Sequence, residues 1–149
     1  KGNTEIVAQK LAALTGSPLF EIDTVHPYPD DYQQTVAISR QELADNARPE
    51  LKSQVEGMAD YDVIYLGFPN WCGTMPMALF TFLESYDFSG KKIAPFCTHG
   101  GGGIGRAVSD IKKLCPQAEV LPALDINGDR AAAADQEISQ WLAKRGLKK

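Results

Sequence analysis

The feature that most constrains the fold is a continuous apolar run at residues 63–66, Val-Ile-Tyr-Leu, set between stretches of helical periodicity. A strand that is apolar at every position is typical of a parallel sheet buried on both faces. We expect this strand to cover 62–68 and a second one to cover 92–97, with a helix between them that begins at Pro76. Strands that alternate with helices predict an α/β domain with a parallel sheet and helices on both faces.

The rest of the chain continues this alternation. Gly16 stops the first predicted helix, Pro49 ends the second, and Pro122 interrupts the last strand. No repeat and no long linker divides the chain, so we expect residues 1–149 to form a single domain. The further predicted elements are helices at 4–14, 32–43, 103–114 and 131–144, and strands at 19–23 and 120–126.

Composition excludes several classes of function. Fifteen basic and nineteen acidic residues give a net charge of −4, so neither nucleic acid nor an anionic membrane is expected as the main partner. No apolar run approaches the roughly 20 residues of a membrane span. The three cysteines lack the spacing of metal ligands and suit reduced thiols in a cytoplasm, so we expect a cytoplasmic protein without a metal site. No Ser-His-Asp order, Walker motif or pair of carboxylates indicates a catalytic residue.

The first candidate site is the segment Gly2, Asn3 and Thr4 at the start of a helix. Free backbone N–H groups and the helix dipole favour an anion at such an end, and a phosphate is the expected ligand. The alternative is a frayed terminus that only resembles a phosphate turn.

Two further candidates follow the predicted strands, where ligands bind in open parallel sheets. The first loop could offer the flat face of a tryptophan, and a glycine there permits close backbone approach; alternatively, the tryptophan folds back onto the core. The second loop exposes backbone N–H groups between glycines and carries a histidine that could polarise a ligand, unless it is a flexible connection with a solvated histidine. The first loop comprises Pro69, Asn70, Trp71, Cys72, Gly73 and Thr74, and the second comprises Thr98, His99, Gly100, Gly101, Gly102 and Gly103.

In this order and spacing, the three segments resemble those of the flavodoxin family. The stretch Tyr-Pro-Asp-Asp-Tyr at 28–32 is similar to a bacterial branch with an elaborated segment after the second strand. The resemblance covers essentially the whole chain. It implies a flavodoxin-like, doubly wound parallel sheet of order 2-1-3-4-5 that binds FMN noncovalently. It also implies that Gly2, Asn3 and Thr4 hold the phosphate, that 69–74 flanks one side of the isoalloxazine with Trp71 in contact, and that 98–103 lines the pyrimidine edge.

Two departures from the family pattern bear on these expectations. The first strand of the fold is missing from this chain, and we expect the gene to encode roughly 6 to 10 apolar, β-branched residues before Lys1. Many flavodoxins stack a tyrosine of the second loop on the flavin, whereas His99 and glycines stand there in this sequence.

The resemblance predicts an electron-transfer flavoprotein that shuttles electrons between redox partner proteins or small acceptors. The alternative on the same fold is an NAD(P)H-dependent quinone or flavin reductase, which needs room for a second planar substrate. A third possibility is an interaction module that has lost FMN. The flavin would supply the chemistry in either redox function, and the protein would tune it.

Overall fold

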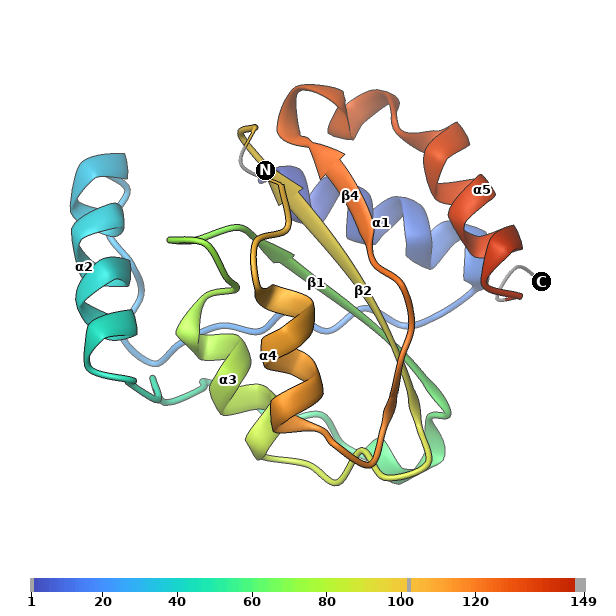
Figure 1. Ribbon diagram of the computed structural model, residues 1–149, viewed down its shortest axis with the longest axis horizontal. Helices are drawn as coiled ribbons and strands as arrows, with labels where there is room; N and C mark the ends of the chain where they lie inside the picture. Colours follow the sequence, from blue (N-terminus) through green and yellow to red (C-terminus); the bar gives the residue numbers. More distant parts are fainter. Residues whose placement is uncertain (1, 102, 147–149) are drawn as a thin grey trace.

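A computed structural model describes residues 2–101 and 103–146 (Figure 1). Within these residues, four parallel strands form one sheet around β2 (Lys92–His99). β2 pairs along its full length with β1 (Val63–Pro69) on one side. On its other side it pairs first with β3 (Glu119–Val120) and then with β4 (Leu124–Asn127). The two short strands form the interrupted strand that the sequence predicts, and Pro122, which has no N–H to donate, lies between them.

Helices cover both faces of the sheet, as the doubly wound expectation requires (Figure 1). One face carries α3 (Met77–Glu84) and α4 (Ala107–Leu114), and the other carries α1 (Asn3–Thr15) and α5 (Asp135–Lys144). Because side chains alternate along a strand, Ile93 and Cys97 of β2 pack under α3 and α4, whereas Ala94 and Phe96 pack under α1 and α5. The two apolar clusters therefore lie on opposite sides of one sheet.

The helix boundaries follow local signals with two corrections. Gly16, with φ of 70°, ends α1 in the left-handed conformation, and its N–H donates to Ala12. The helix expected from Gly103 begins only at Ala107, because Gly103 and Gly105 have φ of 73° and 60° and cannot continue a right-handed helix. The helix expected over 131–144 is split into the 3₁₀ segment η2 (Gly128–Ala133) and α5.

The segment between α1 and β1 lies at one edge of the domain. It contains α2 (Tyr32–Ala44) and the short η1 (Met58–Asp60), and α2 stands apart from the sheet in Figure 1. Asp31 caps α2 by accepting a hydrogen bond from the backbone N–H of Gln33. Arg48 forms a bidentate ion pair with Glu84, which fastens this segment to α3.

The strand expected at 19–23 does not form. Backbone pairing begins only where Thr24 bridges Leu51 in antiparallel fashion. A strand needs a neighbour that exchanges hydrogen bonds with it, and residues 19–23 instead line a cavity whose other walls include β1 and α1. The contribution of this segment is apolar packing, since the ring of Phe20 lies 6.3 Å from that of Phe82 on α3.

Of the helices within 2–101 and 103–146, none combines the length and the apolar character needed to cross a bilayer.

Candidate functional site

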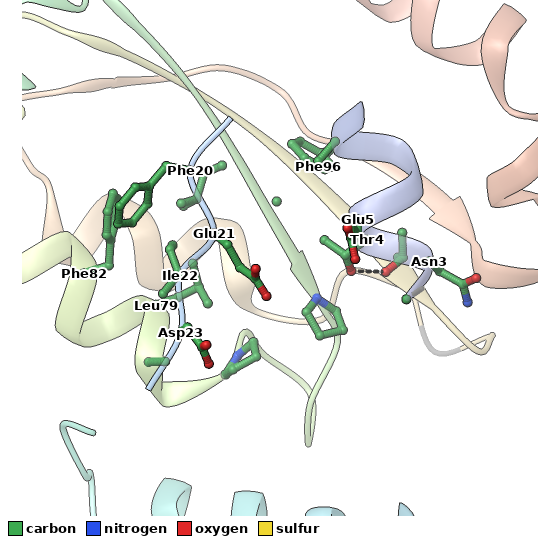
Figure 2. A pocket seen from close by; sticks show the side chains of 18 of the residues that line it. Asn3, Thr4, Glu5, Phe20, Glu21, Ile22, Asp23, Leu79, Phe82 and Phe96 are labelled. Atoms are coloured by element: carbon green, nitrogen blue, oxygen red, sulfur yellow. Dashed lines mark hydrogen bonds between the residues drawn. The ribbon is translucent and has the colours of Figure 1, made fainter. Parts of the chain in front are cut away.

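The three predicted segments meet at the carboxyl ends of the strands. The amino end of α1 lies beside the tips of β2 and β4 (Figure 1). The hydroxyl groups of Thr4 and Thr98 form a hydrogen bond of 2.7 Å, drawn as the dashed line at Thr4 in Figure 2. Asn3 packs against the loop after β4, since a Cβ built on Gly128 would lie 2.5 Å from the Asn3 Nδ2 atom. Segments nearly 100 residues apart in sequence therefore share one site.

The amino end of α1 offers backbone donors to a ligand. Gly2 precedes the helix in an extended conformation, and no side chain caps the first turn. The N–H groups of that turn, on Asn3, Thr4 and Glu5, lie at the positive end of the helix dipole. The Glu5 carboxylate shares the turn but is exposed, and Gln9 donates a hydrogen bond to it at 3.4 Å. This end of the helix can therefore hold an anion through backbone groups.

The loop after β1 is a tight turn. Trp71 and Thr74 exchange backbone hydrogen bonds of 2.7 and 3.2 Å, and the two residues between them, Cys72 and Gly73, have φ of 55° and 87°. Positive φ at both central positions is the pattern of a type I′ turn, which glycine adopts freely and cysteine rarely does. The turn places Trp71 at the cavity. Thr74 is buried, and its hydroxyl donates to Asp110 of α4 at 2.5 Å.

The two loops after β1 and β2 are joined by polar contacts. Asn70 donates from Nδ2 to the carbonyl of Gly103 at 2.7 Å, and its Oδ1 accepts from the N–H of Gly73 at 3.0 Å. The N–H of Arg106 donates to the carbonyl of Gly73 at 2.9 Å. The Asn70 side chain is therefore a spacer between the loops and is not free to turn toward a ligand.

Tyr28, in the segment between α1 and α2, packs against Trp71. Its ring meets the indole edge-on, with centroids 5.0 Å apart and planes at 86°. The Tyr28 hydroxyl donates to Glu42 of α2 at 2.7 Å. Burial first, and then the Glu42 carboxylate, raise the pKa of Tyr28 well above its usual value. The sequence analysis singled out 28–32 for its resemblance to a family branch and missed the Tyr28–Trp71 contact. No local sequence pattern indicates this contact.

The loop after β2 is organised by its histidine. The Nδ1 atom of His99 accepts from the N–H of Gly101 at 2.9 Å, and Nε2 contacts the carboxylate of Asp125 on β4. Gly100 lines the cavity, whereas Gly102 lies outside the described residues. The expectation that this loop exposes its N–H groups therefore does not hold for Gly101, whose N–H has an acceptor within the loop.

One cavity of about 1570 Å³ connects these elements. This volume exceeds the roughly 300–1,000 Å³ of most small-molecule sites, because an apolar arm continues past the polar end. Figure 2 shows both parts, with Asn3 and Thr4 at the polar end and Phe20 and Phe82 along the arm. Of the predicted site residues, the cavity is lined by Gly2, Asn3, Thr4, Pro69, Asn70, Trp71, Cys72, Thr98, His99 and Gly100. The predicted residues Gly73, Thr74, Gly101 and Gly103 are described but do not line it.

A third segment, residues 127–129 where β4 passes into η2, also lines the cavity and was not predicted. The Asn127 side chain accepts from the N–H of Asp129 at 3.1 Å and so shapes the turn. Its Asn-Gly pair follows the last predicted strand, so the rule that selected the other two loops would also have selected this one.

The fold and the site together define an open α/β protein whose ligand cavity lies at the carboxyl edge of a parallel sheet. The chain belongs to the flavodoxin family, because the family model described as Flavodoxin matches residues 1–145. The resemblance seen in the sequence is thereby confirmed.

Solved structures agree with this assignment. A candidate flavoprotein from Bacteroides eggerthii is 30% identical, with a TM-score of 0.86 over 99% of this chain and 93% of its own. A second, from Bacteroides uniformis, is 30% identical, with a TM-score of 0.82 over 94% and 90% of the two chains. A Lactobacillus acidophilus flavoprotein in complex with FMN is 22% identical over 93% and 89%, and its TM-score of 0.68 shows the shared fold. Among curated proteins, none matches this chain significantly.

Proposed function

We propose that this chain binds FMN noncovalently and transfers electrons between redox partner proteins or small acceptors. The observation that carries the proposal is the convergence of the uncapped amino end of α1 with the loops after β1 and β2 around one cavity. FMN has a phosphate at one end and a flat aromatic ring at the other. The flavin supplies the redox chemistry when it is bound, and the protein binds and tunes it.

The polar end of the cavity fits a phosphate. The first-turn N–H groups of α1 and the Thr4 hydroxyl are the donors there, and the helix dipole adds the equivalent of about half a positive charge. Asn3 is held by its packing against Gly128, which keeps the first turn close to the loop after β4. These groups would hold the phosphate without a basic side chain.

The wide part of the cavity fits the ring. Trp71 is held in place by its tight turn and by Tyr28, so it can present a fixed aromatic surface. Pro69, Cys72 and Gly100 line the same cavity. An aromatic wall excludes water from one side of the ring, and the net charge of −4 disfavours added negative charge on it.

The second candidate is an NAD(P)H-dependent quinone or flavin reductase. One specific observation favours it: the cavity extends beyond Trp71 along α2 and the residues that precede α2. This extension is lined by Tyr28, Tyr32, Ser39 and Arg40, and it offers space for a second planar substrate beside the ring.

We also place the protein in the cytoplasm, where the free thiols of Cys72, Cys97 and Cys115 remain reduced.

The first experiment is a titration of the purified chain with FMN, followed by flavin fluorescence and the visible absorbance spectrum. Saturable binding in the micromolar range or tighter supports a flavoprotein, whereas no binding at millimolar FMN overturns the proposal in favour of an interaction module.

The second experiment mixes the loaded protein with NADPH in a stopped-flow instrument, with and without a quinone. Slow reduction that a quinone does not accelerate supports the carrier, and rapid turnover supports the reductase.

A further inference from the structure

Both ring nitrogens of His99 have a partner. Nδ1 accepts from the backbone N–H of Gly101 at 2.9 Å, and Nε2 contacts the carboxylate of Asp125. His99 ends β2 with a side chain that is 11% exposed, and Asp125 stands on the neighbouring β4, where it pairs in register with Cys97. Asp125 lies in the predicted strand at 120–126 but in none of the candidate site segments, and it does not line the cavity.

These two contacts fix the form of the imidazole. A backbone N–H can only donate, so Nδ1 must carry no proton. A carboxylate can only accept, so the proton lies on Nε2. His99 is therefore the neutral Nε2–H tautomer. In the opposite tautomer, Nδ1–H would face the Gly101 N–H, donor against donor, and the hydrogen bond within the loop would be lost.

The geometry points to Asp125 as a positioning residue that acts on the ligand loop through His99. By holding the Nε2–H tautomer, Asp125 keeps the Gly101 N–H inside the loop and unavailable to a ligand. A change at Asp125 would release this donor toward the cavity side of the loop that Gly100 lines. The consequence for a bound flavin rests on the proposed function: the number of N–H donors near the ring edge, and with it the reduction potential, depends on a residue that does not touch the ring.

Among the described residues, Asp125 is the charged group that contacts the His99 side chain. Cys97 on β2 lies beside Asp125 on β4. Burial, together with the Asp125 charge, raises the pKa of the Cys97 thiol to about 12, so this thiol is neutral at ordinary pH. Gly128 approaches the His99 carbonyl from the loop after β4 and brings no charge. The carboxylate of Asp125 is therefore the charged group that holds this tautomer, alongside the Gly101 N–H.

The test is long-range ¹H–¹⁵N NMR of the ligand-free chain, which reports directly which ring nitrogen of His99 carries the proton. We expect Nε2–H in the unmodified protein. In Asp125→Asn, whose amide can donate as well as accept, we expect the Nδ1–H form to appear and the Gly101 amide to exchange with solvent roughly tenfold faster. Asp62→Asn is the matched control: it makes the same substitution at an exposed residue that does not line the cavity, and it should leave both signals unchanged.

Several results would overturn the inference. Nδ1–H in the unmodified protein contradicts it, even if Asp125→Asn does not fold. An unchanged tautomer in a folded Asp125→Asn protein also contradicts it, and so does an equal effect of Asp62→Asn. The reduction potential of the FMN complex, measured on the same variants, extends the test. If FMN does not bind, the proposed function fails while the NMR result still decides the role of Asp125.

Discussion

Gly105 packs directly against the carbonyl group of Gly73, so closely that a Cβ added to Gly105 would overlap the Gly73 oxygen. This contact joins the loop after β2 to the tight turn after β1, and the hydrogen bond from Arg106 to the same carbonyl reinforces it. The contact involves backbone on both sides, so no rotation of a side chain can relieve a clash there. The shape of the Trp71 turn therefore depends on the absence of a side chain at residue 105.

Gly105→Ala should destabilise the protein by about 2–4 kcal/mol. Positive φ costs alanine about 1 kcal/mol, and the backbone overlap adds a steric cost of similar or larger size. Gly90→Ala is the control, because Gly90 also has positive φ, 77°, but a Cβ added there would meet nothing within 4 Å. Urea unfolding of both variants measures the difference. Equal losses would mean that φ alone makes glycine necessary at residue 105.

Thr4→Ala should weaken FMN binding more than riboflavin binding, by roughly tenfold to a hundredfold. FMN alone has the phosphate that the Thr4 hydroxyl would contact, and a charge-assisted hydrogen bond is worth about 1.5–3 kcal/mol. The substitution also leaves Thr98 without its hydroxyl partner, but this cost affects both ligands. Thr15→Ala, at the other end of the same helix, is the control for loss of a hydroxyl. Parallel titrations with both ligands measure the ratio, and equal losses would argue against a phosphate contact.

The architecture could be predicted from the sequence where local pattern and tertiary context agree. The apolar run at 63–66 and the break at Pro122 became β1 and the gap between β3 and β4 because both signals are intrinsic to the residues. The expected strand at 19–23 also carries apolar residues, interrupted by Glu21, but a strand also needs a neighbour, and here the neighbouring space is a cavity. Pattern alone cannot supply a pairing partner.

The site was predictable to the level of its loops but not of its contacts. Glycines and polar residues after strands indicated the loops around Trp71 and His99. The partners of these residues, Tyr28 and Asp125, come from elements distant in sequence, and their roles follow only from the folded geometry. Spacing also could not show that Thr74 points away from the cavity toward Asp110.

Tyr28→Phe should make the stability of the protein less dependent on alkaline pH. The folded state raises the pKa of Tyr28, so its neutral form contributes stability that is complete below about pH 10 and is lost as the pH rises above that value. Phenylalanine keeps the ring against Trp71 but loses the hydrogen bond to Glu42, so we expect a loss of about 1 kcal/mol at pH 7. Thermal unfolding from pH 7 to 11 measures both effects. An equally steep alkaline decline in both proteins would contradict the assignment.

Cys72 should react with iodoacetamide much faster than the other two cysteines. It is exposed, whereas burial raises the pKa of Cys97 to about 12 and that of Cys115 to about 11. At pH 8 these buried thiols are therefore almost entirely protonated, and the thiolate is the reactive form. Mass spectrometry of timed samples measures the rates. Because Cys72 lines the cavity, FMN should slow its labelling, and labelling at the same rate with and without FMN would place the ring elsewhere.

Trp71→Ala should weaken FMN binding by about 1–2 kcal/mol and shift the reduction potentials of the bound flavin. The substitution removes contact area and an aromatic wall that excludes water, and FMN should quench the fluorescence of Trp71 in the unmodified protein. Trp141 is the internal control, because it lies on the buried face of α5 and donates from Nε1 to the Pro122 carbonyl at 2.9 Å. Trp141→Ala should lower the melting temperature first and affect FMN only indirectly. If Trp71→Ala leaves affinity and potentials unchanged while Trp141→Ala alters both, then Trp71 is a packing residue against Tyr28 and the ring does not lie on the loop after β1.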